Sequence, residues 1–306
     1  MKDQFKKILG SVLHKVDKVF YEKKLSIFNF HEITNHPSEY QKKYKIYHSL
    51  EEFQNIIEWV SKNYNFISPN EIGKYKNQRG YALITFDDGF DGAFRYALPF
   101  LIKKKIPSLY FLNMGPIIEQ RPSVISTIEY LNLYNEKFKM FLLSKKIKIP
   151  IYEVNPTILN NFEDINSLNN DKILRFQGNL VELETLKKYK DNDLVFFGNH
   201  LYDHWNIINL NNKEISTFYY KNHTILKGFK NFIDIFAFTH GIPSINFSKN
   251  NLNQILSFNP KYIFFSSGGV GQFKKKIIDR TFLNYNEIKN KIFYYRKFRA
   301  KFINLI

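Results

Sequence analysis

Residues 81–89 read Tyr-Ala-Leu-Ile-Thr-Phe-Asp-Asp-Gly, an apolar run that ends abruptly at two acidic residues and a glycine. Such a run is typical of a buried β-strand followed by a turn. Residues 92–104 then have a helical pattern, and residues 108–112 form a second apolar run. A strand, a helix and a strand with short connections predict two parallel strands joined by a right-handed crossover.

The same alternation continues on both sides of this unit. Apolar runs and helical patterns predict strands at residues 25–30, 66–67, 194–197, 235–238 and 262–266, and helices near residues 50–61, 213–226 and 250–256. Ser49 is the expected N-cap of the first of these helices, because Glu52 three residues later completes a capping box. Repeated βα units fit either an open doubly wound sheet or a closed barrel.

Three segments depart from this alternation. Residues 117–177 are rich in Asn and Lys and predict a helical insertion on the rim of the barrel. Residues 1–24 predict a basic amphipathic helix that either lies on an anionic membrane or packs on its own domain. Residues 284–306 form a basic, aromatic segment whose run 291–299 either touches lipid headgroups or forms a plain amphipathic helix. One domain, residues 25–283, is expected between these ends.

Composition limits the chemistry. The 306 residues are 44% hydrophobic, which suffices for one large core. The absence of cysteine excludes disulfides and cysteine-ligated zinc, so His, Asp and Glu must hold any metal. A net charge of +17 suits an anionic membrane or a phosphate-rich partner, and it equally fits solvated lysines. No nucleic-acid-binding module is recognisable, and no nucleic-acid partner is expected.

Two pairs of residues carry the candidate chemistry. Asp87 and Asp88 follow a predicted strand directly, at the end where α/β folds place their sites. His200 and His204 follow the strand at residues 194–197, and in a helical turn their spacing would direct both imidazoles to one side. Taken alone, each pair also fits a role without chemistry. The acid pair could simply be solvated at the strand end, and the histidines could be structural. Together, one Asp and two His make a three-ligand metal site with an open position for water.

Other familiar motifs are absent. His31 and His36 frame a His-Glu sequence that superficially suggests a zinc protease, but their spacing of five would separate them by roughly 140° on a helix. Neither a phosphate-binding Gly-x-x-x-x-Gly-Lys loop nor a Gly-x-Ser-x-Gly elbow occurs in the sequence.

The blocks at residues 82–89, 97–101 and 106–112 resemble the first motif of the polysaccharide deacetylases, carbohydrate esterase family four. Residues 198–204 look like the metal-binding histidine motif of that family, and residues 236–241 occupy the place of its third motif. The opening at residues 25–31 is similar to the branch that includes the poly-N-acetylglucosamine deacetylases of biofilm systems. The resemblance covers residues 25–280 without the insertion, and it implies a distorted (β/α)7-type barrel.

The resemblance also implies a ligand set and a base. By motif position, Asp88, His200 and His204 would hold a divalent ion, and Asp87 would be the general base. Zinc is the expected ion, although an Asp/His/His set also suits several other divalent ions.

The resemblance further implies an oxyanion donor and a general acid. The backbone N–H of His240 would stabilise the oxyanion. His31 matches the general acid of the biofilm branch, with His240 as a competing acid and a buried structural histidine as the alternative for His31.

The chain departs from the family pattern in its third motif. Ala237 stands where many members have the arginine that holds the base, and Thr239 replaces the usual proline. Arg280 is expected near the site, where it would orient a carboxylate or bind the sugar substrate. A surface salt bridge is the alternative for Arg280.

These features predict a metal-dependent hydrolase that removes N-acetyl groups from a sugar in a surface polysaccharide, capsule or lipid-linked glycan pathway. The alternatives are a hydrolase of another non-peptide C–N amide bond and a catalytically silent carbohydrate-binding domain. Because residues 1–24 lack a signal-peptide pattern, we expect a cytoplasmic location, with peripheral contact at the inner, anionic face of the membrane.

Overall fold

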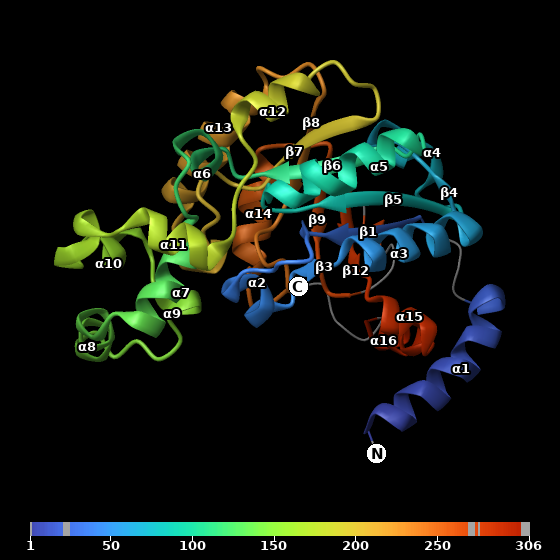
Figure 1. The fold of residues 1–306 in the computed structure, drawn as a ribbon, viewed down its shortest axis with the longest axis horizontal. Helices are drawn as coiled ribbons and strands as arrows, with labels where there is room; N and C mark the ends of the chain where they lie inside the picture. Colours follow the sequence, from blue (N-terminus) through green and yellow to red (C-terminus); the bar gives the residue numbers. More distant parts are fainter. Residues whose placement is uncertain (1, 21–24, 269–272, 275, 301–306) are drawn as a thin grey trace.

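The computed structural model describes residues 2–20, 25–268, 273–274 and 276–300. Its centre is a nearly closed barrel of parallel strands (Figure 1). Around the barrel the strands follow the order β11, β9, β8, β7, β6, β5, β1 and β12. Their bounds are β1 Ser26–Phe30, β5 Tyr81–Phe86, β6 Ser108–Leu112, β7 Val195–Asn199, β8 Phe232–Ala237, β9 Tyr262–Phe265, β11 Ile277–Asp279 and β12 Thr281–Phe282. The predicted distorted (β/α) barrel is confirmed.

The barrel closes at a single residue. β11 pairs with β9, β12 pairs with β1, and only Arg280 separates β11 from β12. The backbone N–H of Arg280 donates to the carbonyl of Phe265 at 2.8 Å. One split strand therefore covers both edges of the sheet, which removes the exposed edges that an open sheet would leave. Two short strands lie outside this ring: β4 (Asn65–Phe66) pairs with β5, and β10 (Phe273–Lys274) pairs with β11.

Side chains of the strands alternate between two cores, as a period of two requires. One set fills the barrel and the other packs under the surrounding helices. The barrel set includes Ile27, Leu83, Leu109, Phe111, Ile235, Phe264 and Ile278. The outer set includes Phe28, Phe30, Ile84 and Phe86, which pack with Phe53 and Ile56 of α3 and Leu98 of α5.

The helices begin where their local sequence allows. Ser49 and Glu52 form the predicted capping box at the start of α3 (Leu50–Asn63), with hydrogen bonds of 3.1 and 3.2 Å. The helix predicted at residues 92–104 has two parts, a π-helical turn η2 (Ala93–Ala97) followed by α5 (Leu98–Lys103). Pro99 lacks an N–H group, so a regular α-helical hydrogen-bond ladder cannot run through this junction.

The predicted insertion is helical, and it leaves the barrel at the carboxyl end of β6. It comprises α6 (Met114–Glu119), α7 (Val124–Tyr134), α8 (Glu136–Ser144), α9 (Pro150–Glu153), α10 (Pro156–Asn160), η3 (Glu163–Ser167) and α11 (Asn170–Gln177). Figure 1 shows α8, α9 and α10 projecting to the left of the barrel. α7 and α11 pack together, and α11 also packs on α2 (Glu39–Tyr44).

Other short elements complete the fold. They are β2 (Glu32–Ile33), β3 (Tyr47–His48), η1 (Pro69–Glu71), α4 (Ile72–Tyr75), α12 (Leu183–Lys188), η4 (Ile207–Asn209), α13 (Asn212–Leu226) and α14 (Lys249–Ser257).

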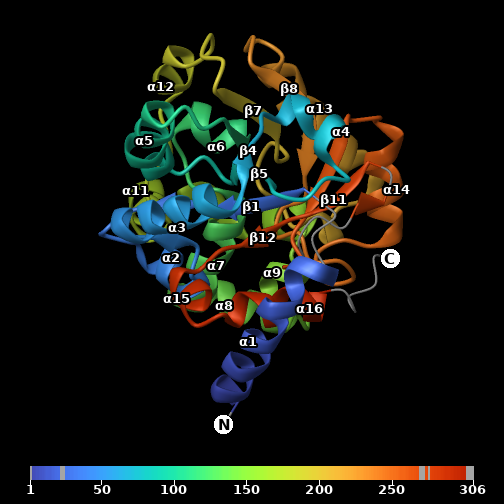
Figure 2. The same ribbon diagram turned by 90° about the vertical axis from the view of Figure 1, so that its right-hand side faces the viewer.

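The two ends of the chain pack on each other. α1 (Lys2–Phe20) lies against α16 (Ile292–Ala300), which follows α15 (Tyr285–Lys289), and Figure 2 shows this contact below the barrel. Gly10 is required there, because a Cβ atom would lie 2.2 Å from the carbonyl oxygen of Lys291. Phe293 of α16 is buried beside Phe28 and Trp59. Thus α1 packs on α16, and α16 packs on the domain through Phe293. Residues 1, 21–24 and 301–306 of the two expected segments lie outside the described residues.

Among the described helices, none is both long and apolar enough to cross a membrane.

A buried carboxylate lies directly beneath the loop after β5. Glu32 follows His31 and accepts hydrogen bonds from the N–H of Ile33 at 2.7 Å and from Nε2 of Gln41 at 3.3 Å. Gly92 packs so closely above it that a Cβ atom would lie 2.1 Å from Glu32 Oε1. Burial raises the pKa of Glu32 to about 8.

This shift predicts a pH-dependent stability. Between about pH 5 and pH 8 an unfolded chain has lost this proton while the folded chain keeps it, so the free energy of unfolding falls as the pH rises. Glu32→Gln stays uncharged, and we expect the variant to lose this part of the slope. Urea unfolding at pH 5 and pH 8 measures it. The exposed Glu51→Gln is the control, and identical slopes for wild type and Glu32→Gln would contradict the prediction.

Candidate metal centre and active site

The two acidic residues after β5 diverge because the chain turns sharply between them. Asp88 has φ of +72° and Gly89 has φ of +77°, so both adopt the left-handed conformation. Aspartate tolerates this region better than most side chains. As a result Asp87 faces the barrel interior and Arg280, while Asp88 faces His200 and His204.

Asp88 and the two histidines form a candidate metal centre. The Nε2 atoms of His200 and His204 lie 3.3 and 2.9 Å from Oδ1 of Asp88, and the three ligand atoms all lie within 4.8 Å of one another. Apart from these two histidines, no described residue donates a hydrogen bond to the buried Asp88 Oδ1, as expected for an oxygen that binds an ion. Burial raises the pKa of Asp88, but His204 and His200 outweigh it and hold the pKa well below its usual range. The donor set therefore fits a divalent ion.

The predicted helical turn at His200 and His204 is wrong. Residues 200–206 form no helix, and Leu201 and His204 have φ of +62° and +58°. The side chain of Asn113, which follows β6, donates to the carbonyls of His200 and Leu201, which are then not free to accept helical hydrogen bonds. Nδ1 of His200 lies 2.9 Å from the carbonyl of Ala237, which fixes the ring and leaves Nε2 toward the site.

Asp87 is held by a buried arginine. The guanidinium of Arg280 donates to Oδ1 and Oδ2 of Asp87 at 2.7 and 2.8 Å, a bidentate pair. Arg280 is only 1% exposed, and its guanidinium lies 5.0 Å from the ring centre of Phe111 and 5.8 Å from that of Phe264. Burial raises the pKa of Asp87, but Arg280, His200 and His31 together outweigh burial and lower the pKa below its ordinary value. Asp87 is therefore an ionised carboxylate at neutral pH and able to accept a proton.

The surface salt bridge considered for Arg280 is wrong, because the residue is buried. Arg280 orients a carboxylate, and its direct contact with a sugar stays a prediction.

Two polar residues that the sequence analysis did not select complete this network. Asn29 donates to Oδ2 of Asp87 at 2.9 Å and accepts from Arg280 and Thr85 at 3.1 and 3.0 Å. The parallel register places Asn29 directly beside Thr85. One feature of the sequence could have indicated Asn29 and Thr85: each is a polar residue within an apolar strand run. Thr85 stands two residues before Asp87, so both face the barrel interior.

Two further histidines border the site. Nε2 of His31, just after β1, lies 3.9 Å from Oδ2 of Asp87. Burial lowers the pKa of His31 below its ordinary value, and Asp88 and Asp87 only partly offset this effect. The ring of His240 lies 5.2 Å from that of His204, and its Nε2 is buried without a hydrogen bond. Burial, followed by the charge of His204, lowers the pKa of His240 to about 3.

A cleft of about 190 Å³ brings these groups together. It is lined by Asn29, His31, Asp87, Asp88, His200, His204, His240 and Ser266, and its walls are Tyr40, Tyr44, Ile46 and Phe282. Of the seven predicted site residues, only Arg280 is not in its lining, since it lies beneath Asp87. Tyr40 and Tyr44 come from α2, and no motif in the sequence indicates that this helix reaches the site.

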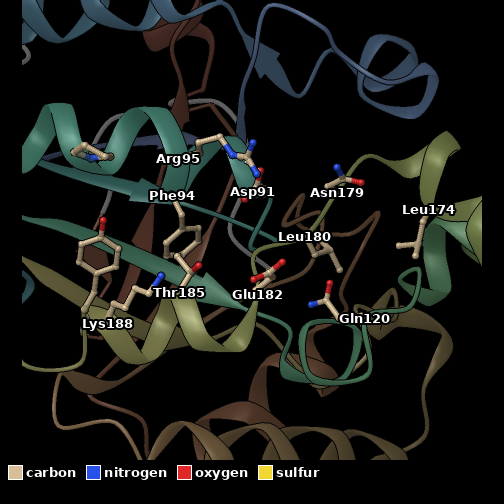
Figure 3. A pocket seen from close by; sticks show the side chains of 12 residues that line it. Asp91, Phe94, Arg95, Gln120, Leu174, Asn179, Leu180, Glu182, Thr185 and Lys188 are labelled. Carbon is tan, nitrogen blue, oxygen red and sulfur yellow. Dashed lines mark ion pairs between the residues drawn. The ribbon is translucent and has the colours of Figure 1, made fainter.

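A second hollow, of about 390 Å³, contains none of the predicted site residues. Figure 3 shows it between the η2 and α5 segment and residues 174–189, with Asp91 and Arg95 paired at its edge. Its wall is joined to the loop after Asp88, because the N–H of Asp91 donates to Asn179 at 3.0 Å and that of Val181 donates to Gly89 at 2.9 Å. These two hydrogen bonds therefore tie residues 179–181 to the loop that carries Asp88.

Comparison with known proteins places the fold. No family model and no curated protein matches the sequence. Among solved structures, the Streptococcus pyogenes deacetylase PplD in complex with acetate aligns with a TM-score of 0.57 at 14% identity, covering 87% of this chain and 94% of that one. IcaB from Ammonifex degensii aligns at 0.56 and 16%, covering 90% and 97%. A polysaccharide deacetylase from Bacillus cereus aligns at 0.56 and 10%, covering 89% and 70%.

The chain has the polysaccharide deacetylase fold. This likeness places the candidate site on the scaffold that the motif resemblance implied, and the activity is argued below from the site itself.

The buried pair predicts a large stability loss on truncation. Arg280→Met leaves the Asp87 carboxylate buried without its partner, and we expect the free energy of unfolding to fall by about 3–5 kcal/mol. The double variant Asp87→Asn with Arg280→Met should recover part of this loss, because no buried charge remains. Urea denaturation of the four proteins measures the coupling.

The control is Arg95→Met, which removes an exposed helical ion pair with Asp91. Exposed pairs contribute about 1 kcal/mol at most. If Arg280→Met costs no more than this control, the assignment of the buried pair fails.

Proposed function

We propose that the chain is a metal-dependent hydrolase that removes the N-acetyl group from an N-acetylated sugar of a glycan. The observation that carries the proposal is the convergence of two units on one cleft. Asp88, His200 and His204 form the ligand set, and beside them Asp87 is held ionised by Arg280. One protein of the same fold is a deacetylase in complex with acetate, the acid that such a reaction releases.

Asp88, His200 and His204 would hold the ion, for which zinc is our proposal. When bound, a divalent ion supplies a Lewis acid that polarises an amide carbonyl and lowers the pKa of water. Asp88 and the two rings are buried or nearly so, which excludes bulk water from this side of the cleft.

The general base in this proposal is Asp87. Its carboxylate takes one proton from the attacking water, whose oxygen bonds to the acetamide carbon. Arg280 and Asn29 hold the carboxylate in place during this transfer. The N–H of His240 makes no hydrogen bond to another described residue, so it is available to donate to the oxyanion.

We assign the general acid to His31. The C–N bond breaks when the amine nitrogen receives a proton, and Nε2 of His31 lies in the cleft lining 3.9 Å from Asp87. Burial lowers the pKa of His31 below its ordinary value, and Asp88 and Asp87 oppose this shift. His240 is a poorer acid, since its pKa of about 3 leaves it uncharged at neutral pH. The products are acetate and a free amino sugar.

The cleft is small relative to typical ligand sites of roughly 300–1,000 Å³. Its 190 Å³ suits one acetamido group and the edge of one sugar ring, with the remaining glycan outside. Tyr44 and Phe282 line the cleft, where aromatic side chains can pack against such a ring. Two points stay predictions. One is that the substrate belongs to a surface polysaccharide, capsule or lipid-linked glycan pathway, and the other is that the chain is cytoplasmic.

A catalytically silent carbohydrate-binding domain would need neither a base nor its arginine beside a metal. Hydrolysis of another non-peptide C–N amide uses the same chemistry, and the choice of substrate in the assay separates it from deacetylation.

The assay is acetate release from N-acetylglucosamine oligomers by zinc-loaded protein. We expect His31→Ala to lower kcat by about 10²–10⁴-fold with unchanged zinc content, because a general acid contributes that much. Asp88→Asn should lose the zinc itself, measured by elemental analysis after dialysis.

The matched control is His36→Ala, an exposed histidine five residues from His31. It should keep both zinc and activity. A fully active His31→Ala enzyme would remove His31 from the mechanism. Bound zinc without acetate release from any oligomer would favour the silent domain or another amide.

A further inference from the structure

The outer end of the insertion exposes a group of large apolar side chains. α8 buries Phe138 and Leu142 in the core, while Met140 and Leu143 are 65% and 67% exposed on its other side. Ile149, in the turn before α9, is 53% exposed. Together with the lysines of this turn they form a surface that we call the insertion tip: Met140, Leu143, Lys145, Lys146, Lys148 and Ile149.

Three lysines of the insertion tip form no ion pair within the described part of the chain. On α8, Lys137 pairs with Asp164 and Lys139 pairs with Glu136. In contrast, Lys145, Lys146 and Lys148 form no ion pair with a described residue, and all three are exposed. Glu153 instead accepts the backbone N–H groups of Lys148 and Ile149, at 3.1 and 2.6 Å.

The shape of the insertion tip is built in advance. Lys146 adopts a left-handed conformation with φ of +58°, and its N–H donates to Leu143 at 3.0 Å. The N–H of Ile147 donates to Leu142, also at 3.0 Å, which ends α8 with a closed turn. Presenting these side chains therefore requires little ordering of the backbone on binding.

The insertion tip belongs to the same end of the barrel as the cleft. The insertion follows the carboxyl end of β6, and Figure 1 shows α8 with α10 at the outer end of the insertion. α7, which packs on α8, is joined to α2 by an ion pair of Glu129 with Lys43 and a hydrogen bond of Tyr134 to Glu39. α2 in turn supplies Tyr40 and Tyr44 to the cleft wall.

We propose that the insertion tip binds the surface of an anionic phospholipid bilayer. Met140, Leu143 and Ile149 would enter the boundary between headgroups and acyl chains, and the three lysines would contact lipid phosphates. Exposed apolar residues interleaved with unpaired lysines are complementary to the surface of an anionic bilayer. A neutral or cationic partner would offer the lysines no opposite charge. The proposal goes beyond deacetylation and does not depend on it.

The test is sedimentation of the full chain with vesicles of phosphatidylcholine alone or of an equimolar mixture with phosphatidylglycerol. We expect the chain to bind the mixed vesicles only. We also expect added salt to weaken this binding. Replacing Lys145, Lys146 and Lys148 by Gln should lower the affinity roughly 100-fold, since each lysine near an anionic surface contributes about fivefold. Met140→Gln with Leu143→Gln should lower it at least tenfold for the loss of apolar insertion.

The matched control replaces Lys103, Lys104 and Lys105 by Gln, three exposed lysines at the end of α5 with the same change in charge. This control should retain binding, and thermal unfolding should show that all variants fold. An equal loss in the control would mean attraction by bulk charge and would overturn the proposal.

Two other outcomes would also overturn it. Loss of binding only on Ile8→Gln with Val12→Gln would assign the contact to α1, whose Phe5, Ile8 and Val12 are exposed. A dimer in solution that Leu143→Gln dissociates, without vesicle binding, would make the insertion tip an interface between copies of the chain.

Discussion

The pairing of Arg280 with Asp87 connects the closure of the barrel to its chemistry. Arg280 is the residue between β11 and β12, so its backbone lies where the two edges of the sheet meet. Its side chain crosses the interior above Phe111 and Phe264 and ends on Asp87. A buried arginine would be costly alone, and a buried aspartate likewise, but each satisfies the other. The residue at which the ring closes is therefore also the residue that holds the proposed base.

The barrel interior is layered around this pair. Apolar side chains fill the lower part, Asn29 and Thr85 form a polar layer beside the pair, and the cleft opens beyond it. The left-handed residues Asp88, His204 and His240 lie in the loops after three different strands. Such conformations persist only where surrounding contacts impose them, and here they direct side chains of different strands toward one point.

Much of the scaffold could be predicted from local sequence. The strands at residues 81–86 and 108–112 coincide with β5 and β6, because apolar runs bounded by turn residues are a local signal. The candidate ligand set could also be predicted, since the acid pair and the two histidines follow such strands and the motif resemblance selects Asp88 from the pair. The conformation of the histidine loop could not, because Asn113 from another strand end determines it. The aromatic wall from α2 likewise depends on tertiary packing.

Arg280 shows where local prediction ends. It was expected near the site to orient a carboxylate, but its partner depends on the barrel closing at residue 280. Ala237 stands where many family members have the base-holding arginine, and in this chain that contact comes from the closing strand. An arginine on a different strand can therefore hold the base, because side chains from all the strands meet in the barrel interior.

The most direct test of the account is an anomalous difference map from crystals of the protein grown with zinc. The account predicts one strong peak within bonding distance of Asp88, His200 and His204, with Asp87 still paired to Arg280 next to it. A peak elsewhere, or none at these three residues, would contradict the central claim that this barrel builds a metal centre beside a buried base.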